Sequence, residues 1–208
     1  MTAQNSTPRP TGRGRLSKLD RRKLLLDAAN EVFAEQGFHK ASVEEIAEHA
    51  GVSKPVLYQH FPSKLELYLT VLDQHVEELM LRVRQAIRAS TNNHDRLIEA
   101  VRVFFDVIDT NTRGYRLLFS TDLLQPEVRT RIQKATDACV DAVFDIVRHD
   151  SGLELYHAKM IAVNLVGLIH VSAQHWQDSG KPIPKEEAIM ATVAFAWGGL
   201  ARVPKIEP

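Results

Sequence analysis

The sequence predicts an all-α protein with a small N-terminal helix-turn-helix domain and a larger helical C-terminal domain. Apolar residues recur at helical spacing along most of the chain, serines stand in front of several of these runs, and no segment alternates as a strand does. The 208 residues suffice for one large domain or two small ones. We expect the first domain at residues 18–65 and the second at residues 66–208.

The first 23 residues are strongly basic, although the formal net charge of the whole chain is zero. They contain seven Lys and Arg against the single acid Asp20, a net charge of +6, so the remaining residues carry −6. This asymmetry indicates an anionic partner at the amino end. Residues 1–17 are rich in Pro, Gly, Thr and Arg, and we expect them to form a disordered basic arm.

Several features favour a soluble, cytoplasmic protein. Cys139 is the single cysteine, so no internal disulfide can form, and the start of the chain lacks the apolar segment of a signal peptide. The longest apolar runs, at 160–169 and 188–203, are shorter than the roughly 20 residues that span a bilayer. We therefore expect two buried helices there and no membrane contact.

The first two helices are bounded by recognisable residues. The apolar pattern that begins near residue 24 predicts a helix ending at Gly37, the residue type that best tolerates a left-handed C-terminal conformation. Ser42 and Glu45 have the spacing of a capping box, which predicts the start of a short second helix. Gly51 ends that helix.

The third and fourth helices follow closely. Ser53 is placed to cap the third helix, with Pro55 in its first turn, where a missing N–H costs nothing. Ser63 is placed to cap a long fourth helix that runs to about Ala89. Three short helices with a glycine turn between the second and third form the helix-turn-helix pattern.

The rest of the chain also has helical periodicity. The predicted helices lie at 97–108, 112–120, 126–149, 155–178 and 185–202. The short breaks "SGL" and "SGKPIP" separate the last three of them.

The third helix has the composition of a DNA-reading element. Its apolar side packs on the first two helices, and its opposite side is free to enter a major groove. Gln59 and His60 can hydrogen-bond base edges, and Pro55 and Val56 can touch a thymine methyl group. The residues predicted to contact DNA are Ser42, Ser53, Lys54, Pro55, Val56, Tyr58, Gln59, His60 and Lys64, with Arg13 and Arg15 from the arm.

Some of these residues position the protein without reading sequence. Tyr58, Lys64 and the Ser42 hydroxyl suit phosphates, and Arg13 or Arg15 can enter a minor groove. The alternative for the arm is a solvated tail without a defined contact. Glu44 is unusual as an acid near DNA; it either reads a cytosine amino group or favours the positive N-terminus of the second helix.

The order of a capped helix, "AGVSK", "LYQHF" and "SK" followed by "EL" resembles the DNA-binding domain of the TetR family of bacterial regulators over roughly residues 20–70. The likeness implies a layout of about nine helices, a recognition helix at Lys54–His60, and phosphate contacts from Ser42 and Lys64. "GVSKPVLYQHF", "SKLELYL", "MIAVNLVGL" and "FAWGGL" are similar to the actinobacterial fatty-acid-synthesis regulators of that family. This implies a long-chain acyl-CoA effector and a fatty acid synthase promoter as target.

The apolar residues of the C-terminal helices either line an effector cavity or fill a core, and helical spacing does not separate the two. The resemblance implies a cavity, because members of the family hold effectors among these helices. The predicted effector-binding residues are Phe104, Phe105, Ile108, Arg113, Tyr115, Leu118, Phe119, Cys139, Val143, Phe144, Val163, Val166 and Ile169. An acyl chain needs an apolar tunnel, and a CoA phosphate needs cations at its mouth. The candidates are Arg113, Arg116, Arg129 and Arg131.

The last helix combines small and aromatic residues. Small residues let helices approach closely, and a helix that is apolar all round must be buried against something. Within a monomer this is core; the resemblance implies half of a four-helix homodimer interface, formed by Trp176, Ala191, Ala194, Phe195, Trp197 and Gly198. A dimer presents two recognition helices about 34 Å apart to a near-palindromic site.

No pattern indicates a metal, a cofactor or catalysis. His170 and His175 are five residues apart and share no helix face, and neither HExxH nor paired-cysteine spacing occurs. No nucleophile motif, P-loop or dinucleotide motif is present either. The alternatives to an acyl-CoA-responsive regulator are a regulator of drug-efflux type that senses another apolar molecule, and a small-molecule binding protein or enzyme that kept the helix-turn-helix as scaffold.

Overall fold

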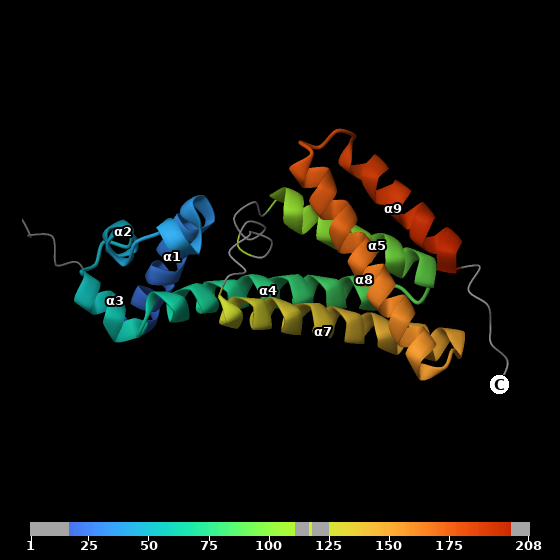
Figure 1. The fold of residues 1–208 in the computed structure, drawn as a ribbon, viewed down its shortest axis with the longest axis horizontal. Coiled ribbons are helices and arrows are strands. Elements are labelled where there is room, and N and C mark those ends of the chain that lie inside the picture. The colour runs from blue at the N-terminus through green and yellow to red at the C-terminus, as the bar shows by residue number, and fades with distance from the viewer. Residues whose placement is uncertain (1–16, 111–116, 118–124, 201–208) are drawn as a thin grey trace, which may run out of the picture.

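The computed structural model describes residues 17–110, 117 and 125–200 (Figure 1). These residues contain helices and no strand, which confirms the all-α class. The helices are α1 (Lys18–Lys40), α2 (Val43–His49), α3 (Lys54–His60), α4 (Lys64–Arg88), α5 (Asn93–Thr110), α7 (Pro126–Ser151), α8 (Leu155–Asp178) and α9 (Lys185–Leu200). The predicted arm and the predicted helix at 112–120 lie outside the described residues, apart from Ser17 and Leu117.

Serines start several of the helices, although not all in the predicted way. The Ser42 and Ser63 hydroxyls accept hydrogen bonds from the backbone N–H of Glu45 and Glu66, at 3.0 and 3.1 Å. Ser53 occupies the predicted N-cap position of α3, but its side chain makes no cap bond. Pro55 in the first turn removes one N–H that would otherwise need an acceptor.

The first helix departs from its predicted end. Gly37 has φ of 75°, the left-handed conformation that its position predicts, yet the helical segment resumes beyond this kink and continues to Lys40. At the other end Ser17 and Asp20 form a complete capping box, each side chain bonding the other residue's backbone N–H.

Two apolar cores lie along a long α4 (Figure 1). The N-terminal core joins α1, α2 and α3 to the first half of α4, around the fully buried Phe33, Phe61 and Tyr68. The C-terminal core joins the second half of α4 to α5, α7, α8 and α9. Leu117 and Val128 come from the later part of the chain but pack into the N-terminal core, so the cores are linked by more than α4.

The last two helices are not fully buried, contrary to the prediction from their apolar runs. On α8 the exposed side carries Tyr156, Met160 and Val163, the last with 45% of its surface accessible. On α9 Phe195 is 74% exposed. By length and composition alone, α8 is long and apolar enough to cross a membrane, because its 24 residues extend beyond the run at 160–169. Of its most apolar 18-residue stretch, 22% is buried inside the protein.

Candidate DNA-binding and ligand sites

Helix α3 has one buried face and one free face. Leu57 and the following Phe61 are completely buried, which fixes the helix on α1 and α2. The opposite side exposes most of the predicted contacts, with Tyr58 41% accessible. Lys54, Pro55 and Gln59 are also exposed, while Val52, Val56 and His60 are half-buried. The exposed side of this helix is therefore accessible to a major groove, which is wide enough to admit an α-helix.

A carboxylate of α2 holds the first residue of α3. The Lys54 ammonium group hydrogen-bonds the Glu44 carboxylate and lies 5.9 Å from the centre of the Tyr58 ring. This hydrogen bond lowers the pKa of Glu44 and raises the pKa of Lys54. Glu44 therefore has a partner that neither predicted role included.

A cation of α1 holds the other end of α3. The Arg22 guanidinium donates to the His60 carbonyl at 3.1 Å and lies 4.2 Å from the centre of the Phe61 ring. It thus satisfies a carbonyl at the helix C-terminus. Burial, with the nearby charges of Lys18, Arg21 and Arg22, lowers the pKa of His60. The ring is neutral at neutral pH, so it offers one donor and one acceptor nitrogen.

The predicted phosphate contacts surround this helix. Lys64 is half-buried, donates to the His39 carbonyl at 3.4 Å and lies 4.7 Å from the Phe38 ring centre. The Ser42 hydroxyl accepts its cap bond and keeps an O–H donor for another acceptor. Arg13 and Arg15 lie outside the described residues.

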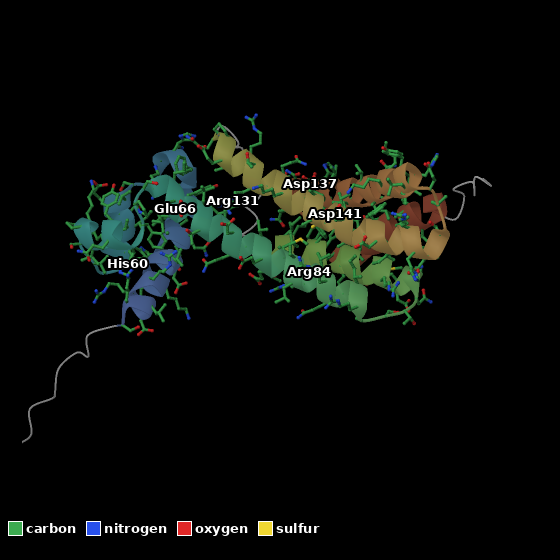
Figure 2. The ribbon with its side chains drawn as sticks, turned by 90° about the horizontal axis from the view of Figure 1, so that it is seen from below. His60, Glu66, Arg84, Arg131, Asp137 and Asp141 are labelled. Atoms are coloured by element: carbon green, nitrogen blue, oxygen red, sulfur yellow. The ribbon has the colours of Figure 1, made fainter. Side chains whose placement is uncertain are left out.

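The two cores meet where the start of α7 lies against α4. Figure 2 shows Arg131 at this junction, where its guanidinium donates to both carboxylate oxygens of Asp73, at 2.7 and 3.0 Å. Burial raises the pKa of Asp73, and the charge of Arg131 opposes that rise. Arg131 therefore joins α7 to α4.

The C-terminal domain contains an apolar cavity of about 320 Å³ between α5, α7 and α8, with one lining residue each from α4 and α9. It is lined by Ile87, Asn93, Arg96, Leu97, Ala100, Val143, Ile146, Val147, Asp150, Ser151, Leu153, Ile161, Leu165, Ile169 and Trp197. Of the predicted effector-binding residues, Val143 and Ile169 belong to this lining. Its one arginine, Arg96, was not among the predicted cations. Its partner Asp150 is 54 residues away, a pairing that no local pattern indicates.

The other predicted effector-binding residues have varied positions. Phe104, Phe105, Ile108, Cys139 and Val166 are buried in the C-terminal core. Phe144 is half-buried on α7, and Val163 lies on the exposed side of α8, away from the cavity lining. Arg113, Tyr115, Leu118 and Phe119 lie outside the described residues, as does Arg116, whereas Arg129 is exposed on α7.

Cys139 packs α7 against α4. Its sulfur lies 3.2 Å from the Met80 sulfur, and burial raises the pKa of the thiol to about 11. The thiol is therefore protonated and unreactive at neutral pH.

The predicted dimer residues divide into two groups. Ala191, Ala194, Phe195, Trp197 and Gly198 are exposed on α9. Trp176 is instead buried, and its indole N–H donates to the Ile183 carbonyl at 2.9 Å inside the same chain. A hollow beside the exposed group is lined by Ile161, Asn164, Leu165, Leu168, Phe195, Ala196 and Gly199.

Within the described ranges, no three His, Cys, Asp or Glu side chains gather in a way that holds a metal ion. The cluster of charges between α5 and α9 consists of paired groups. Arg102 donates to both carboxylate oxygens of Glu186 at 2.6 and 2.7 Å, and Lys185 bonds Asp106 at 2.7 Å. These pairs fasten α9 onto α5.

The helix-turn-helix matches a known family. Residues 25–71 match the model of the bacterial regulatory proteins of the TetR family. The chain is 53% identical over 201 residues to the HTH-type transcriptional activator FasR of Mycolicibacterium smegmatis, a match that covers 94% of this chain and 92% of the relative. It is also 29% identical over 184 residues to the regulator RutR of Escherichia coli K12, covering 86% of this chain and 82% of the relative.

Solved structures share the fold. A TetR-like regulator from Rhodococcus sp. RHA1 superposes with a TM-score of 0.75 at 25% identity, covering 91% of this chain and all of the other. FadR of Bacillus subtilis, solved in complex with stearoyl-CoA, superposes with a TM-score of 0.72 at 18% identity, covering 85% and 98% of the two chains.

A recognition helix with a free polar face, on an all-helical scaffold of this kind, defines a DNA-binding transcriptional regulator rather than an enzyme. The chain belongs to the TetR family of bacterial regulators. Within that family it is of the FasR type.

Proposed function

We propose that the chain is a homodimeric, cytoplasmic regulator of fatty acid biosynthesis genes, with a long-chain acyl-CoA as effector. The observation that carries this proposal is the high identity to FasR over nearly the full length of both chains. That relative is an activator, which supports activation as the direction of control here. The shared fold of FadR, solved with stearoyl-CoA, supports an acyl-CoA ligand.

In this proposal residues 18–65 bind DNA. Gln59 and His60 read base edges, and Pro55 and Val56 supply apolar contacts in the major groove. Ser42, Ser53, Lys54, Tyr58 and Lys64 bind phosphates, and the arm adds Arg13 and Arg15. The exposure of α3 and the bonds that hold both of its ends support these roles.

Residues 66–208 form the ligand-binding and dimerisation domain in this proposal. The exposed apolar sides of α8 and α9 pair with the same surface of a second copy, giving a four-helix interface. Phe195 and Trp197 supply area while Ala191, Ala194 and Gly198 allow close approach. The dimer spaces its recognition helices about 34 Å apart, which suits successive major grooves of a near-palindromic operator.

A second candidate is a regulator that senses a smaller apolar molecule. The cavity of about 320 Å³ favours it, since this lies at the small end of the range of ligand sites.

Fluorescence anisotropy tests the proposal directly. The protein is titrated onto a fatty acid synthase promoter duplex and a random duplex, with and without palmitoyl-CoA, and with free CoA as control. We expect promoter-specific binding that changes with palmitoyl-CoA and ignores free CoA. Specific binding that palmitoyl-CoA leaves unchanged would favour the smaller ligand, and equal binding to both duplexes would refute control of that promoter.

A further inference from the structure

We propose that Arg131 is a positioning residue: by binding Asp73, it fixes the angle between the start of α7 and α4, and with it the orientation of the DNA-binding domain. The consequence of this angle for gene control rests on the proposed function. The angle itself does not depend on that function, because it is a property of the protein free of DNA and ligand.

Helix α7 lies along α4 and takes part in both apolar cores (Figures 1 and 2). Near its start, Val128 is 1% exposed inside the N-terminal core, and Ile132 packs against the same core. Further along, Cys139 and Val140 are buried in the C-terminal core. The segment from Val128 to Val140 is about 18 Å of continuous helix. Helix α7 is therefore a second rigid connection between the domains, beside α4.

Helix α4 passes from one core to the other at Asp73. Leu72 is its last buried residue in the N-terminal core, and Leu79 is its first in the C-terminal core. Between these two residues no side chain of α4 is fully buried, and Val76 packs partly against both cores. Apolar packing therefore constrains α4 least at this point, which is where Arg131 binds it.

The exposure of this pair argues against a role in stability alone. The Arg131 and Asp73 side chains are 46% and 35% exposed, and ion pairs this exposed stabilise a fold far less than a buried side chain such as Val128 does. A charged hydrogen bond does have narrow limits of distance and direction, here 2.7 and 3.0 Å to the two carboxylate oxygens. The pair therefore selects one angle among those that apolar packing allows.

Three carboxylates share the edge of α4 that Arg131 binds. Glu66, Asp73 and Glu77 are seven and four residues apart, a spacing that places them on one face of a helix. Burial and the charges of Glu77 and Glu66 raise the pKa of Asp73. Arg131 is the cation that opposes them. Reversing the charge of Arg131 therefore places four negative charges together and moves the start of α7 away from α4.

Double electron–electron resonance on the free protein tests the proposal. Nitroxide labels are attached at Glu48→Cys on α2 and Asp145→Cys on α7, both exposed positions. Their separation reports the orientation of the DNA-binding domain relative to α7. The buried Cys139 is left in place, and labelled protein is diluted with unlabelled protein so that only distances within one protomer are measured.

We expect Arg131→Asp to shift or split the distance distribution, and Arg131→Gln to do so to a smaller extent. Combining Arg131→Asp with Asp73→Arg should restore the original distribution, because the same contact forms with its charges exchanged. A folding defect would not be restored in this way. Lys159→Asp is the matched control: it reverses a charge of similar exposure in a pair with Asp141, inside the C-terminal domain, and should leave the distribution unchanged.

Anisotropy with the same variants measures the consequence for DNA binding. A changed angle alters the spacing of the two recognition helices of the dimer, and this spacing affects the operator far more than random DNA. The ratio of promoter affinity to random-duplex affinity should fall about fivefold or more in Arg131→Asp and recover in the exchanged pair.

An unchanged distance distribution in both Arg131→Asp and Arg131→Gln would overturn the proposal, as would a shift that the exchanged pair does not restore. If the distribution shifts and is restored while the unaltered protein shows no preference for the promoter, the positioning role stands and the proposed function fails. If the promoter preference exists but does not follow the distribution, the proposed function stands and the consequence of this angle for DNA binding is refuted.

Discussion

The recognition helix and the ligand cavity are built in different ways. The outer face of α3 comes from seven consecutive residues, and the start of this helix is marked by Ser53 and Pro55. The cavity is assembled from five helices, and its charged pair joins residues 54 positions apart. A site on one short helix can be predicted from the spacing of residues in the sequence, whereas a site between helices depends on how the helices pack.

The largest effect on operator binding is expected from the proposed dimer surface, which, like the cavity, is formed by several helices. Gly198→Leu should separate the protomers and remove most operator affinity, because two half-sites are then bound independently. Among the described residues, no heavy atom beyond the adjoining backbone of α9 lies within 4 Å of a Cβ placed at Gly198, so this part of the protomer has room for a side chain there. Sedimentation velocity measures the mass.

The control is Gln133→Leu, which adds an equally apolar side chain to an exposed position of α7. Its sedimentation should match that of the unaltered protein. A dimer that persists in Gly198→Leu would show that the interface is elsewhere.

Base reading should give the next largest effect. Gln59→Ala should weaken operator binding by roughly 1–3 kcal/mol and relax the preference at one base position, if the amide makes a bidentate contact. Binding to random DNA should not change, and competition with single-base operator variants measures the difference. Equal losses on operator and random DNA would remove Gln59 from the base-reading residues.

Phosphate binding should give a smaller effect that is uniform across sequences. Lys64→Ala should weaken binding to operator and random duplexes alike and reduce the salt slope of log K by about one unit. Tyr58→Phe should weaken both without changing the slope, since it removes no charge. A salt titration measures the slope, and an unchanged slope for Lys64→Ala would contradict its assigned role.

The smallest expected effect concerns the pair between Glu44 and Lys54. Glu44→Gln removes a negative charge near DNA that competes with a phosphate for Lys54, so binding to random duplex should strengthen several-fold with a steeper salt slope. Glu48→Gln, also exposed on α2, is the control for charge. Weaker binding in Glu44→Gln would indicate that the carboxylate itself contacts DNA.

Prediction from sequence succeeded where one local signal decides the outcome. The Ser42 and Ser63 caps and the buried Leu57 follow from spacing within a few residues. It failed for the Ser53 side chain, because a position before a helix does not ensure a hydrogen bond.

The C-terminal residues show the same limit over longer distances. Val163 and Val166 are three residues apart on one apolar helix, yet one faces outward and the other is buried. Both sides of α8 are apolar, so periodicity does not tell the side that packs inside the chain from the side left exposed. Arg96 and Asp150 both line the cavity, but the packing of the helices was needed to place these distant residues side by side.

The most direct test of the account asks whether these two regions affect each other. The affinity for dodecanoyl-CoA is measured from Trp197 fluorescence with and without saturating operator DNA, and the affinity for operator with and without saturating dodecanoyl-CoA. Thermodynamic linkage requires the two ratios to be equal, and the account predicts a common factor of about 5–150. A ligand affinity unchanged by operator DNA would contradict the claim that the cavity controls the recognition helix.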